Sequence, residues 1–398
     1  MANLYIFSSS LGRYEDSQAI RIGNYLNSEV LKDKFASINI FGIGVGLARG
    51  YRVMDVTGGV ENYSQASGFL RRNIEYRFCY PDKYKGLRDF VYRKIVSLVK
   101  DDDVVISASG SVEAHLGVLK ARKEKEFIWV ADYGDPLSYV EKKMRPWFYK
   151  RSVRDEKEIV KTSNLVLVTT NETKNLFCKT YFAKNIEAIE YGFQNVVIEK
   201  EKTFCGGMVS AGHIGVAYKS NRDMRPLIHS LAELTNEGVR VDFYLAGPRS
   251  AAFDRLAKLY SKQKSFFNYN SNDYIEYEES IERLKKFDIM PIIGNKSVYQ
   301  IPGKCFILIS LPIPILYIKQ TNDDPFLKLF ADAGGVLVCE NKKSAIRKKL
   351  TFYLENQKQI KEAAKSRIHN KAVQMYNEKN TTKRLMNIID ELYKERNK

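Results

Sequence analysis

The chain has 398 residues, of which 44% are hydrophobic and 28% charged, with only 10 Pro and 24 Gly. This composition excludes a disordered or fibrous polypeptide, and a typical domain size of roughly 150 residues predicts two to three domains. The formal net charge of +17 favours polyanionic partners or phosphorylated substrates, without choosing among nucleic acid, anionic lipid and small phosphates.

Cysteine usage and hydropathy exclude further classes of protein. The five cysteines are odd in number, lie far apart and form no Cys-x-x-Cys pair, so neither a disulfide framework nor a thiolate zinc site is expected. The longest apolar run, residues 305–318, contains two prolines and is too short to cross a bilayer. No basic region with a cleavage site precedes the first apolar segment, so we expect a cytoplasmic protein.

Apolar runs rich in β-branched and aromatic residues alternate with helical stretches, which is typical of parallel sheets with crossover helices. A first series of strands is expected at residues 4–7, 38–43, 104–107, 127–131, 165–169 and 187–189, and a second at 208–210, 241–246, 266–269, 289–293, 313–318 and 336–338. The charged stretch 198–203 between them predicts a linker, with one domain over 1–200 and another over 201–379. The last helix, 380–398, has one apolar stripe and is expected to pack back on the first domain.

Polar loops follow two strands of the expected first domain. Their small residues are Ser9, Ser10 and Gly12 in one loop, and Ser109 and Gly110 in the other. Such residues at the carboxyl ends of strands suit the close approach of a ligand, and an ordinary polar loop is the alternative. His115 lies in the next helix on an apolar stripe, so it is either a packed histidine or a ligand contact.

Two carboxylates, Asp132 and Asp135, follow another strand at the edge of the sheet where α/β proteins collect ligand groups. Either residue could bind hydroxyl groups or act as a base, and the alternative is an Asp-Pro turn that caps the next helix. Residues 101–103 contain an Asp-x-Asp pattern, but they precede a strand rather than follow one, so we predict no metal site there.

The segment 142–154 interleaves aromatic and basic residues. Its candidate membrane contacts are Lys142, Lys143, Arg145, Trp147, Phe148, Lys150 and Arg151. Such a surface suits anionic head groups, with the aromatic rings at the interface, and a solvated helix start with core aromatics is the alternative. The first hypothesis predicts peripheral association with the inner face of a membrane.

The segment 209–234 has the parts of a phosphate site. A strand is expected to end in a loop with Gly212 and Gly215, and the basic residues Lys219, Arg222 and Arg225 then lead into an amphipathic helix. Glycines permit close backbone approach, a helix start offers unpaired N–H groups, and cations add charge. The alternative is an ordinary turn with a solvated basic rim.

Residues 300–318 form the second segment whose sequence favours binding of an anionic ligand. Pro302 and Gly303 open a short apolar helix with Lys304 in its first turn, and the chain passes through Pro312 into a buried strand. A lysine in the first turn opposes the helix dipole, which favours an anionic ligand beside it. The alternative is a lysine whose stem lies along the apolar helix.

These motifs follow one another in a familiar order over nearly the whole chain. The segments are Val130 to Pro136, Leu165 to Gly192, Ser210 to Gly212, Arg222 to Pro226, Val241 to Gly247 and Ile301 to Leu316. In order and spacing the chain resembles the GT-B glycosyltransferases of the retaining group 1 class (family 4-like). The resemblance implies an α/β protein of two Rossmann-like domains whose parallel sheets face a cleft.

The resemblance also implies an activity. It predicts a metal-independent glycosyltransferase, without a cofactor or a nucleic-acid partner, that moves a sugar with retention from a nucleotide sugar to a polysaccharide or lipid-linked glycan in surface polysaccharide biosynthesis. Arg222 and Lys304 would hold the donor diphosphate, and Asp132 and Asp135 would also serve catalysis. The other donor contacts would be Gly212, His213, Lys219, Arg225, Gly247, Tyr269, Pro302 and Gly303. The acceptor contacts would be Ser9, Ser10, Gly12, Ser109, Gly110 and His115.

The chain departs from this family at the ribose site. The acidic residue that the family carries three positions after the lysine is Ile307 here, and Gln300 stands where another glutamate is common. Either another residue holds the ribose, or the nucleotide differs, or the protein is a non-catalytic GT-B scaffold or regulatory subunit of a polysaccharide assembly complex.

Overall fold

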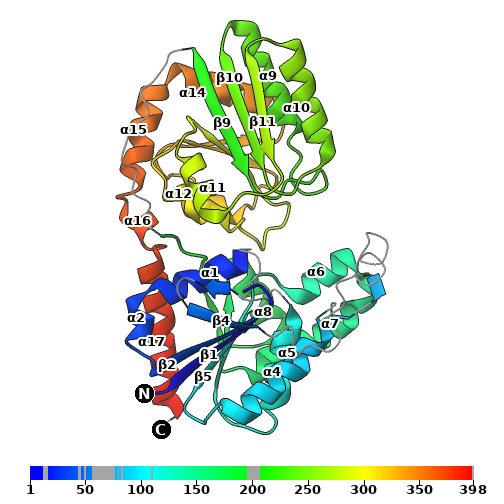
Figure 1. Ribbon diagram of the computed structural model, residues 1–398, viewed down its shortest axis with the longest axis vertical. Coiled ribbons are helices and arrows are strands. Elements are labelled where there is room, and N and C mark those ends of the chain that lie inside the picture. Colours follow the sequence, from blue (N-terminus) through cyan, green and yellow to red (C-terminus); the bar gives the residue numbers. More distant parts are fainter. Residues whose placement is uncertain are drawn as a thin grey trace. The chain divides into compact units, whose positions relative to one another are not determined.

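The computed structural model describes residues 1–11, 17–43, 46–48, 51–55, 77–78, 80–81, 84–108, 111–194 and 207–396. The chain forms two compact units, one of Met1–Gly192 with Glu378–Lys398 and the other of Phe193–Asn377. The boundary expected near residue 200 falls in residues 195–206, outside the described residues. Each unit combines helices with parallel strands, so the predicted α/β class is confirmed (Figure 1).

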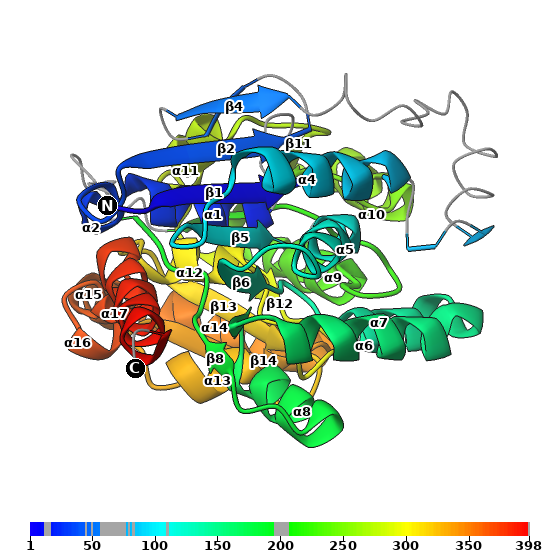
Figure 2. The same cartoon turned by 90° about the horizontal axis from the view of Figure 1, so that it is seen from below.

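An eight-stranded sheet forms the centre of the first unit in the described part of the chain. Its strands are β1 (Asn3–Ser8), β2 (Ser37–Gly42), β3 (Gly46–Ala48), β4 (Tyr51–Asp55), β5 (Val104–Ala108), β6 (Ile128–Asp132), β7 (Leu165–Val168) and β8 (Ile186–Ala188). Their order is β3-β4-β2-β1-β5-β6-β7-β8, and β3 with β4 is the antiparallel pair. Figure 2 shows β4, β2, β1, β5 and β6 in this order. Strands β5, β6 and β7 are buried throughout because helices cover both faces, which explains their continuous apolar sequence.

Helices enclose two apolar cores in this unit. They are α1 (Ser17–Asn27), α2 (Glu29–Lys32), α4 (Lys85–Leu98), α5 (Val112–Ala121), α6 (Leu137–Met144), the short 3-10 helix η2 (Pro146–Phe148), α7 (Tyr149–Thr162), α8 (Asn171–Tyr181) and α17 (Glu378–Arg396). One face of the sheet packs against α4, α5, α7 and α8 around Trp129 and Phe177. The other face packs against α1, α2 and α17, with Leu385 and Ile389 of α17 fully buried beside Ile22 (Figure 1).

The second unit contains two three-stranded parallel sheets in the described residues, with the orders β11-β10-β9 and β12-β13-β14. Their strands are β9 (Met208–Ile214), β10 (Arg240–Ala246), β11 (Phe267–Asn272), β12 (Met290–Ile293), β13 (Ile315–Lys319) and β14 (Val336–Glu340). A parallel bridge between Ala211 and Ile289 joins β9 to β12. The sheets therefore share one core, which includes Val209, Phe243 and Leu316.

The helices of the second unit follow the alternation read from the sequence. They are α9 (Arg225–Leu234), the 3-10 helix η3 (Thr235–Glu237), α10 (Ala251–Gln263), α11 (Tyr277–Leu284), α12 (Lys304–Ile309), α13 (Pro325–Phe330), α14 (Lys343–Glu355), α15 (Gln357–Arg367) and α16 (Lys371–Gln374). No helix in the described part of the chain is long and apolar enough to span a membrane.

One predicted strand end is wrong. Strand β9 continues through Ile214, so Gly212 lies inside the strand and Gly215 is the first residue after it. A Cβ on Gly212 would lie 2.1 Å from the ring of Phe287, so this glycine makes room for an aromatic side chain from a distant segment. Local sequence could not show this packing partner.

Candidate functional site

The centre of the candidate site is a pair of glycines at the carboxyl ends of two neighbouring strands. Gly215 follows β9 with φ +130° and Gly247 follows β10 with φ +98°, conformations that favour glycine. The Gly215 N–H donates to the Ala246 carbonyl at 2.7 Å. A Cβ on Gly247 would lie only 3.1 Å from the Gly215 backbone. The turn after β9 is therefore held tightly against the end of β10.

The ammonium group of Lys304 lies over this turn. Lys304 begins α12, and a Cβ on Gly215 would fall 1.3 Å from its Nζ atom. No hydrogen-bond acceptor or carboxylate partner for Nζ is present among the described residues. Burial, and then the charge of Arg222, lowers the pKa of Lys304 to about 7. The missing Gly215 side chain thus creates the space that the lysine occupies.

The guanidinium group of Arg222 reaches the same turn from the loop before α9. Its Nη1 donates to the Val216 carbonyl at 2.9 Å, and its Nη2 donates to Asn295 Oδ1 at 2.7 Å. The buried Nε of Arg222 has no hydrogen-bond partner in the described structure, and burial lowers the pKa of the Arg222 side chain. Because Val216 follows Gly215 directly, Arg222 and Lys304 converge on one turn, and their mutual repulsion contributes to the lowered lysine pKa.

Side chains from distant segments hold the Arg222 loop in place. Lys296 Nζ donates to the Ser220 carbonyl at 2.6 Å, and Asn341 Nδ2 donates to the Asp223 carbonyl at 3.0 Å. Gln320 Nε2 donates to the carbonyls of both Asn221 and Gly294. The loop is therefore fixed before any ligand arrives, and the arrangement offers a preorganised site for an anion with at least two negative oxygens.

Other predicted donor contacts next to the turn are neutral or form part of the backbone. His213 is buried, with Nδ1 3.2 Å from the Pro291 carbonyl, and burial followed by the charge of Lys304 lowers its pKa to about 3. Pro302 is buried, and Gly303 caps α12 in a right-handed helical conformation. The structure brings these residues together with Arg222 and Lys304.

The remaining predicted donor contacts do not converge on the turn. Arg225 forms a bidentate ion pair with Asp223, so its charge is already matched. Lys219 is exposed and contributes to lowering the pKa of Asp223. The Tyr269 hydroxyl donates to Asp254, and Gly212 faces Phe287.

Ile307 stands where the resembled glycosyltransferases carry an acidic residue. It is 7% exposed and belongs to the buried side of α12. Gln300 is half-buried, and its carbonyl accepts a hydrogen bond from Asn295 Nδ2 at 3.4 Å. Sequence reasoning missed Asn295, although a Gly-Asn pair directly after the buried strand β12 was a signal for a ligand-side polar group.

In the first unit, Asp132 is engaged in a structural ion pair. Both of its carboxylate oxygens lie 3.0 Å from Arg21 Nε, and both residues are fully buried. Arg21 Nη1 also donates to the carbonyls of Ile189 and Glu190, at 2.6 and 2.9 Å. The pair ties α1 to β6 and to the segment after β8. Asp135, three residues on, is exposed.

Of the residues proposed for the acceptor side, some are buried, one is half-buried, and the rest lie outside the described residues. His115 is fully buried, its Nδ1 lies 2.7 Å from Ser107 Oγ, and its ring stacks on Tyr133 at 4.5 Å. Burial lowers the pKa of His115 to about 3, which fits a packed neutral histidine. Ser10 is buried and Ser9 half-buried after β1. Gly12, Ser109 and Gly110 lie outside the described residues.

The predicted membrane segment forms η2 and parts of α6 and α7. Phe78, Met144 and Trp147 are 70%, 55% and 51% exposed, and the Arg77 guanidinium lies 5.5 Å from the Trp147 ring centroid. Lys142, Lys143, Lys150 and Arg151 are exposed as well, whereas Phe148 is half-buried. The assignment of Arg145 to this surface is wrong, because Arg145 is buried and paired with Glu141.

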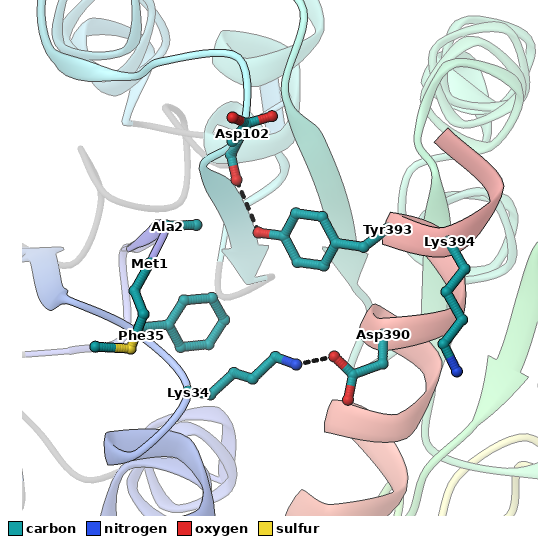
Figure 3. A pocket seen from close by; sticks show the side chains of 8 residues that line it. All are labelled: Met1, Ala2, Lys34, Phe35, Asp102, Asp390, Tyr393 and Lys394. Atoms are coloured by element: carbon teal, nitrogen blue, oxygen red, sulfur yellow. Dashed lines mark hydrogen bonds and ion pairs between the residues drawn. The ribbon is translucent and has the colours of Figure 1, made fainter. Parts of the chain in front are cut away.

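A cavity and the Asp-x-Asp pattern lie at the edge of the first sheet where its parallel strands begin. A cavity of about 450 Å³ lies between Phe35 and α17 (Figure 3). Two contacts join its polar groups: Lys34 pairs with Asp390, and the Tyr393 hydroxyl donates to the Asp102 carbonyl at 2.7 Å. Asp103, in the Asp-x-Asp pattern, accepts hydrogen bonds from the backbone N–H groups of Asn3 and Lys100. The described residues contain no group of three ligands for a metal ion.

Comparison with known proteins supports the fold. No protein-family model and no curated protein matches the chain. Among solved structures, it is similar to sucrose-phosphate synthase from Thermosynechococcus elongatus (TM-score 0.63, 10% identity, 99% of both chains). It is also similar to Anabaena HepE in complex with UDP and glucose (TM-score 0.63, 10% identity, 98% of this chain and 99% of that chain). A glycosyltransferase from Rickettsia africae is similar as well (TM-score 0.59, 14% identity, 99% of both chains). The two α/β units therefore form the GT-B fold, which these glycosyltransferase structures share.

Proposed function

We propose that the chain is a glycosyltransferase that binds the diphosphate of a nucleotide sugar at the Gly215 turn. The observation that carries the proposal is the convergence of Arg222 and Lys304, two cations without a carboxylate partner in the described structure, on one glycine turn at the carboxyl ends of β9 and β10. This edge of an α/β sheet is where such folds bind phosphate groups. The HepE structure, which holds UDP and glucose on a similar fold, supports the ligand class.

Stabilisation of the leaving group would be the main catalytic device. As the bond from the sugar to the diphosphate breaks, negative charge grows on the departing phosphate oxygens. Arg222 and Lys304 would neutralise that charge in a buried setting, where electrostatic interactions are stronger than in water. Because the loop is held by Lys296, Gln320 and Asn341, the cations need little rearrangement when the charge develops.

We propose that the reaction retains configuration, and the resemblance to the group 1 class supports this. In a retaining reaction on one face of the sugar, a donor phosphate oxygen can accept the proton of the attacking hydroxyl, so no protein base is required. This agrees with the buried pairing of Asp132 with Arg21, which leaves that carboxylate without access to a substrate. We propose no metal ion and no cofactor for the reaction.

The acceptor we propose is a polysaccharide or a lipid-linked glycan of surface polysaccharide biosynthesis. We propose that an exposed patch of the first unit contacts the membrane, and we define this membrane patch as Phe78, Met144 and Trp147 with the cations Lys142, Lys143, Lys150 and Arg151. Exposed apolar side chains among cations suit the interface of an anionic leaflet, where each cation contributes about 1 kcal/mol. The patch would bring the enzyme to a lipid-linked acceptor on the cytoplasmic face of the membrane.

A non-catalytic GT-B protein of a polysaccharide assembly complex is the second candidate. One observation favours it: the buried Ile307 replaces the family's ribose carboxylate. A scaffold of this kind would bind a nucleotide but would neither hydrolyse nor transfer a sugar.

The test combines nucleotide binding with donor turnover. We expect nucleoside diphosphates and their sugars to raise the melting temperature, and one nucleotide sugar to be hydrolysed or transferred. Arg222→Ala and Lys304→Ala should each lower turnover by about 100- to 1000-fold, as the loss of about 2.7 to 4 kcal/mol of transition-state stabilisation requires. Lys258→Ala, an exposed lysine on α10, is the matched control and should be unchanged. Binding without turnover by any donor would favour the scaffold, and no nucleotide binding would overturn both the site and the activity.

A further inference from the structure

The second unit contains a polar groove on one face of the β9-β10-β11 sheet. The parallel register aligns Ser210, Asp242 and Asn268 in one row across the strands, and Gly212, Tyr244 and Asn270 in the next. The side chains of each row point to the same face because strand residues alternate. The exposed side chains of Asn268 and Asn270 thus lie beside Asp242 and Tyr244 on the same face.

This face differs from the other side of the same strands. Val209, Ala211, Phe243 and Phe267 point the opposite way and are buried in the core. Both faces of a parallel sheet are normally covered by helices and lined with apolar residues. On this face Ser210 bonds to Asp288 and Gly212 faces Phe287, so the polar residues that call for another explanation are Asp242, Tyr244, Asn268 and Asn270.

The wall of the groove comes from the end of α11 and the turn that follows it. The groove encloses about 380 Å³, and Arg283, Lys286 and Phe287 line its side. In Figure 1, α11 lies below the labels of β9 and β11. This volume lies within the range of sites for small ligands.

Two polar atoms in the groove are buried without partners. Tyr244 is 5% exposed, and its hydroxyl group has no hydrogen-bond partner in the described part of the chain. Arg283 pairs with Glu279 through Nη2 at 3.2 Å, but its buried Nε has no partner in the described part of the chain, and its guanidinium carbon lies 4.6 Å from the Tyr244 ring centroid. Buried polar groups normally have partners, so these two atoms are placed for a ligand that both donates and accepts hydrogen bonds.

The lining indicates the chemistry of that ligand. Its side chains combine amides, hydroxyls, one carboxylate and two cations, so the groove is neither strongly charged nor apolar. A nucleic acid requires a denser positive surface, and a lipid or a protein requires more exposed apolar area. Sugar hydroxyls donate and accept hydrogen bonds at once, which matches neighbouring amide, carboxylate and hydroxyl groups.

We propose that this sheet-face groove binds a neutral oligosaccharide next to the proposed diphosphate site. The groove runs from the row of Ser210, which at about 3.3 Å per residue lies roughly 16 Å from the glycine turn, to Asn272, whose carbonyl accepts a hydrogen bond from the Gly247 N–H at 3.1 Å. Asn268, Asn270 and Asp242 bind the hydroxyl groups of the glycan, and the Tyr244 hydroxyl and Arg283 Nε bind its inner hydroxyls. The residues that bind the glycan differ from Arg222 and Lys304, the residues proposed to hold the diphosphate.

The test measures glycan binding in the absence of any nucleotide. The probes are di- to tetrasaccharides of glucose, galactose, mannose and N-acetylglucosamine, titrated by calorimetry against the full chain. Wild type is compared with Asn270→Ala and with Tyr244→Phe, which removes one hydroxyl and keeps the ring. Asn322→Ala, an exposed asparagine elsewhere in the second unit, is the matched control. Circular dichroism melts confirm that all four proteins are folded.

We expect at least one neutral oligosaccharide to bind, with an affinity about three- to tenfold lower for each groove variant and unchanged for Asn322→Ala. No binding by wild type, or equal binding by all four proteins, would overturn the groove assignment. Loss of glycan binding in Lys304→Ala but not in Asn270→Ala would also overturn it, because the glycan would then occupy the diphosphate site. The donor assays under the proposed function are independent of each of these outcomes.

Discussion

The substitution Gly215→Ala tests the geometry of the proposed diphosphate site without removing either cation. A Cβ at this position would lie 1.3 Å from Lys304 Nζ, so the ammonium must retreat by about 2 Å to reach an ordinary contact distance. A charge-assisted hydrogen bond is about 2.7 to 2.9 Å long, and such a retreat breaks it. Losing a hydrogen bond to a charged group costs about 1.5 to 3 kcal/mol, which corresponds to about 10- to 150-fold in affinity.

The same substitution also strains the backbone, and this effect needs its own control. At φ +130° an alanine costs about 1 to 3 kcal/mol of folding free energy. Gly238 has φ +79°, and no atom lies within 4 Å of the Cβ that an alanine would add. Gly238→Ala should therefore lower stability to a similar degree while leaving anion affinity unchanged.

The assay is calorimetric titration with inorganic pyrophosphate and with UDP, alongside urea unfolding. Pyrophosphate reports the cations alone, because it has no base or ribose. A double-mutant cycle with Lys304→Ala isolates the mechanism, since Gly215→Ala should add little once the lysine is absent. Unchanged pyrophosphate affinity in Gly215→Ala, equal losses in Gly215→Ala and Gly238→Ala, or an undiminished effect in the Lys304→Ala background would each refute the reasoning.

Three other predictions concern protonation, the buried ion pair and the membrane patch. Because the pKa of Lys304 is lowered to about 7, sulfate, which stays ionised throughout, should bind more weakly as pH rises from 6 to 8.5, and Lys304→Arg should abolish that dependence. Asp132→Ala should destabilise the first unit by about 3 to 5 kcal/mol in urea unfolding, because it leaves Arg21 buried without its partner. A smaller loss in the double variant Arg21→Met with Asp132→Leu would show that the unpaired charge, rather than lost packing, causes the destabilisation. Replacing the cations of the membrane patch, Lys142, Lys143, Lys150 and Arg151, with Gln should reduce sedimentation with phosphatidylserine vesicles. The same change at four exposed lysines of the second unit, Lys258, Lys262, Lys348 and Lys358, should not reduce it, and equal losses in the two variants would reject the patch.

Several features of this protein were readable from sequence because they depend on neighbours along the chain. Apolar runs alternating with amphipathic helices predicted parallel α/β sheets, since strands covered on both faces need continuous apolar sequence. Pro302 and Gly303 predicted the start of a short helix at Lys304, because proline and glycine act on the backbone locally. The apolar stripe of the last helix likewise predicted a buried face on α17.

Other features depended on contacts between residues far apart in the sequence. Arg222 and Arg225 look alike in a basic cluster, yet Arg225 pairs with Asp223, while Arg222 reaches Asn295 and the Gly215 turn. Asp132 stood at a ligand-binding edge by position, but Arg21, from a helix that begins far upstream, engages its carboxylate. Local propensity shows where a charge stands on its strand or helix. Only the folded chain decides whether an opposite charge lies within hydrogen-bond reach, because packing of the sheets and helices brings that partner there.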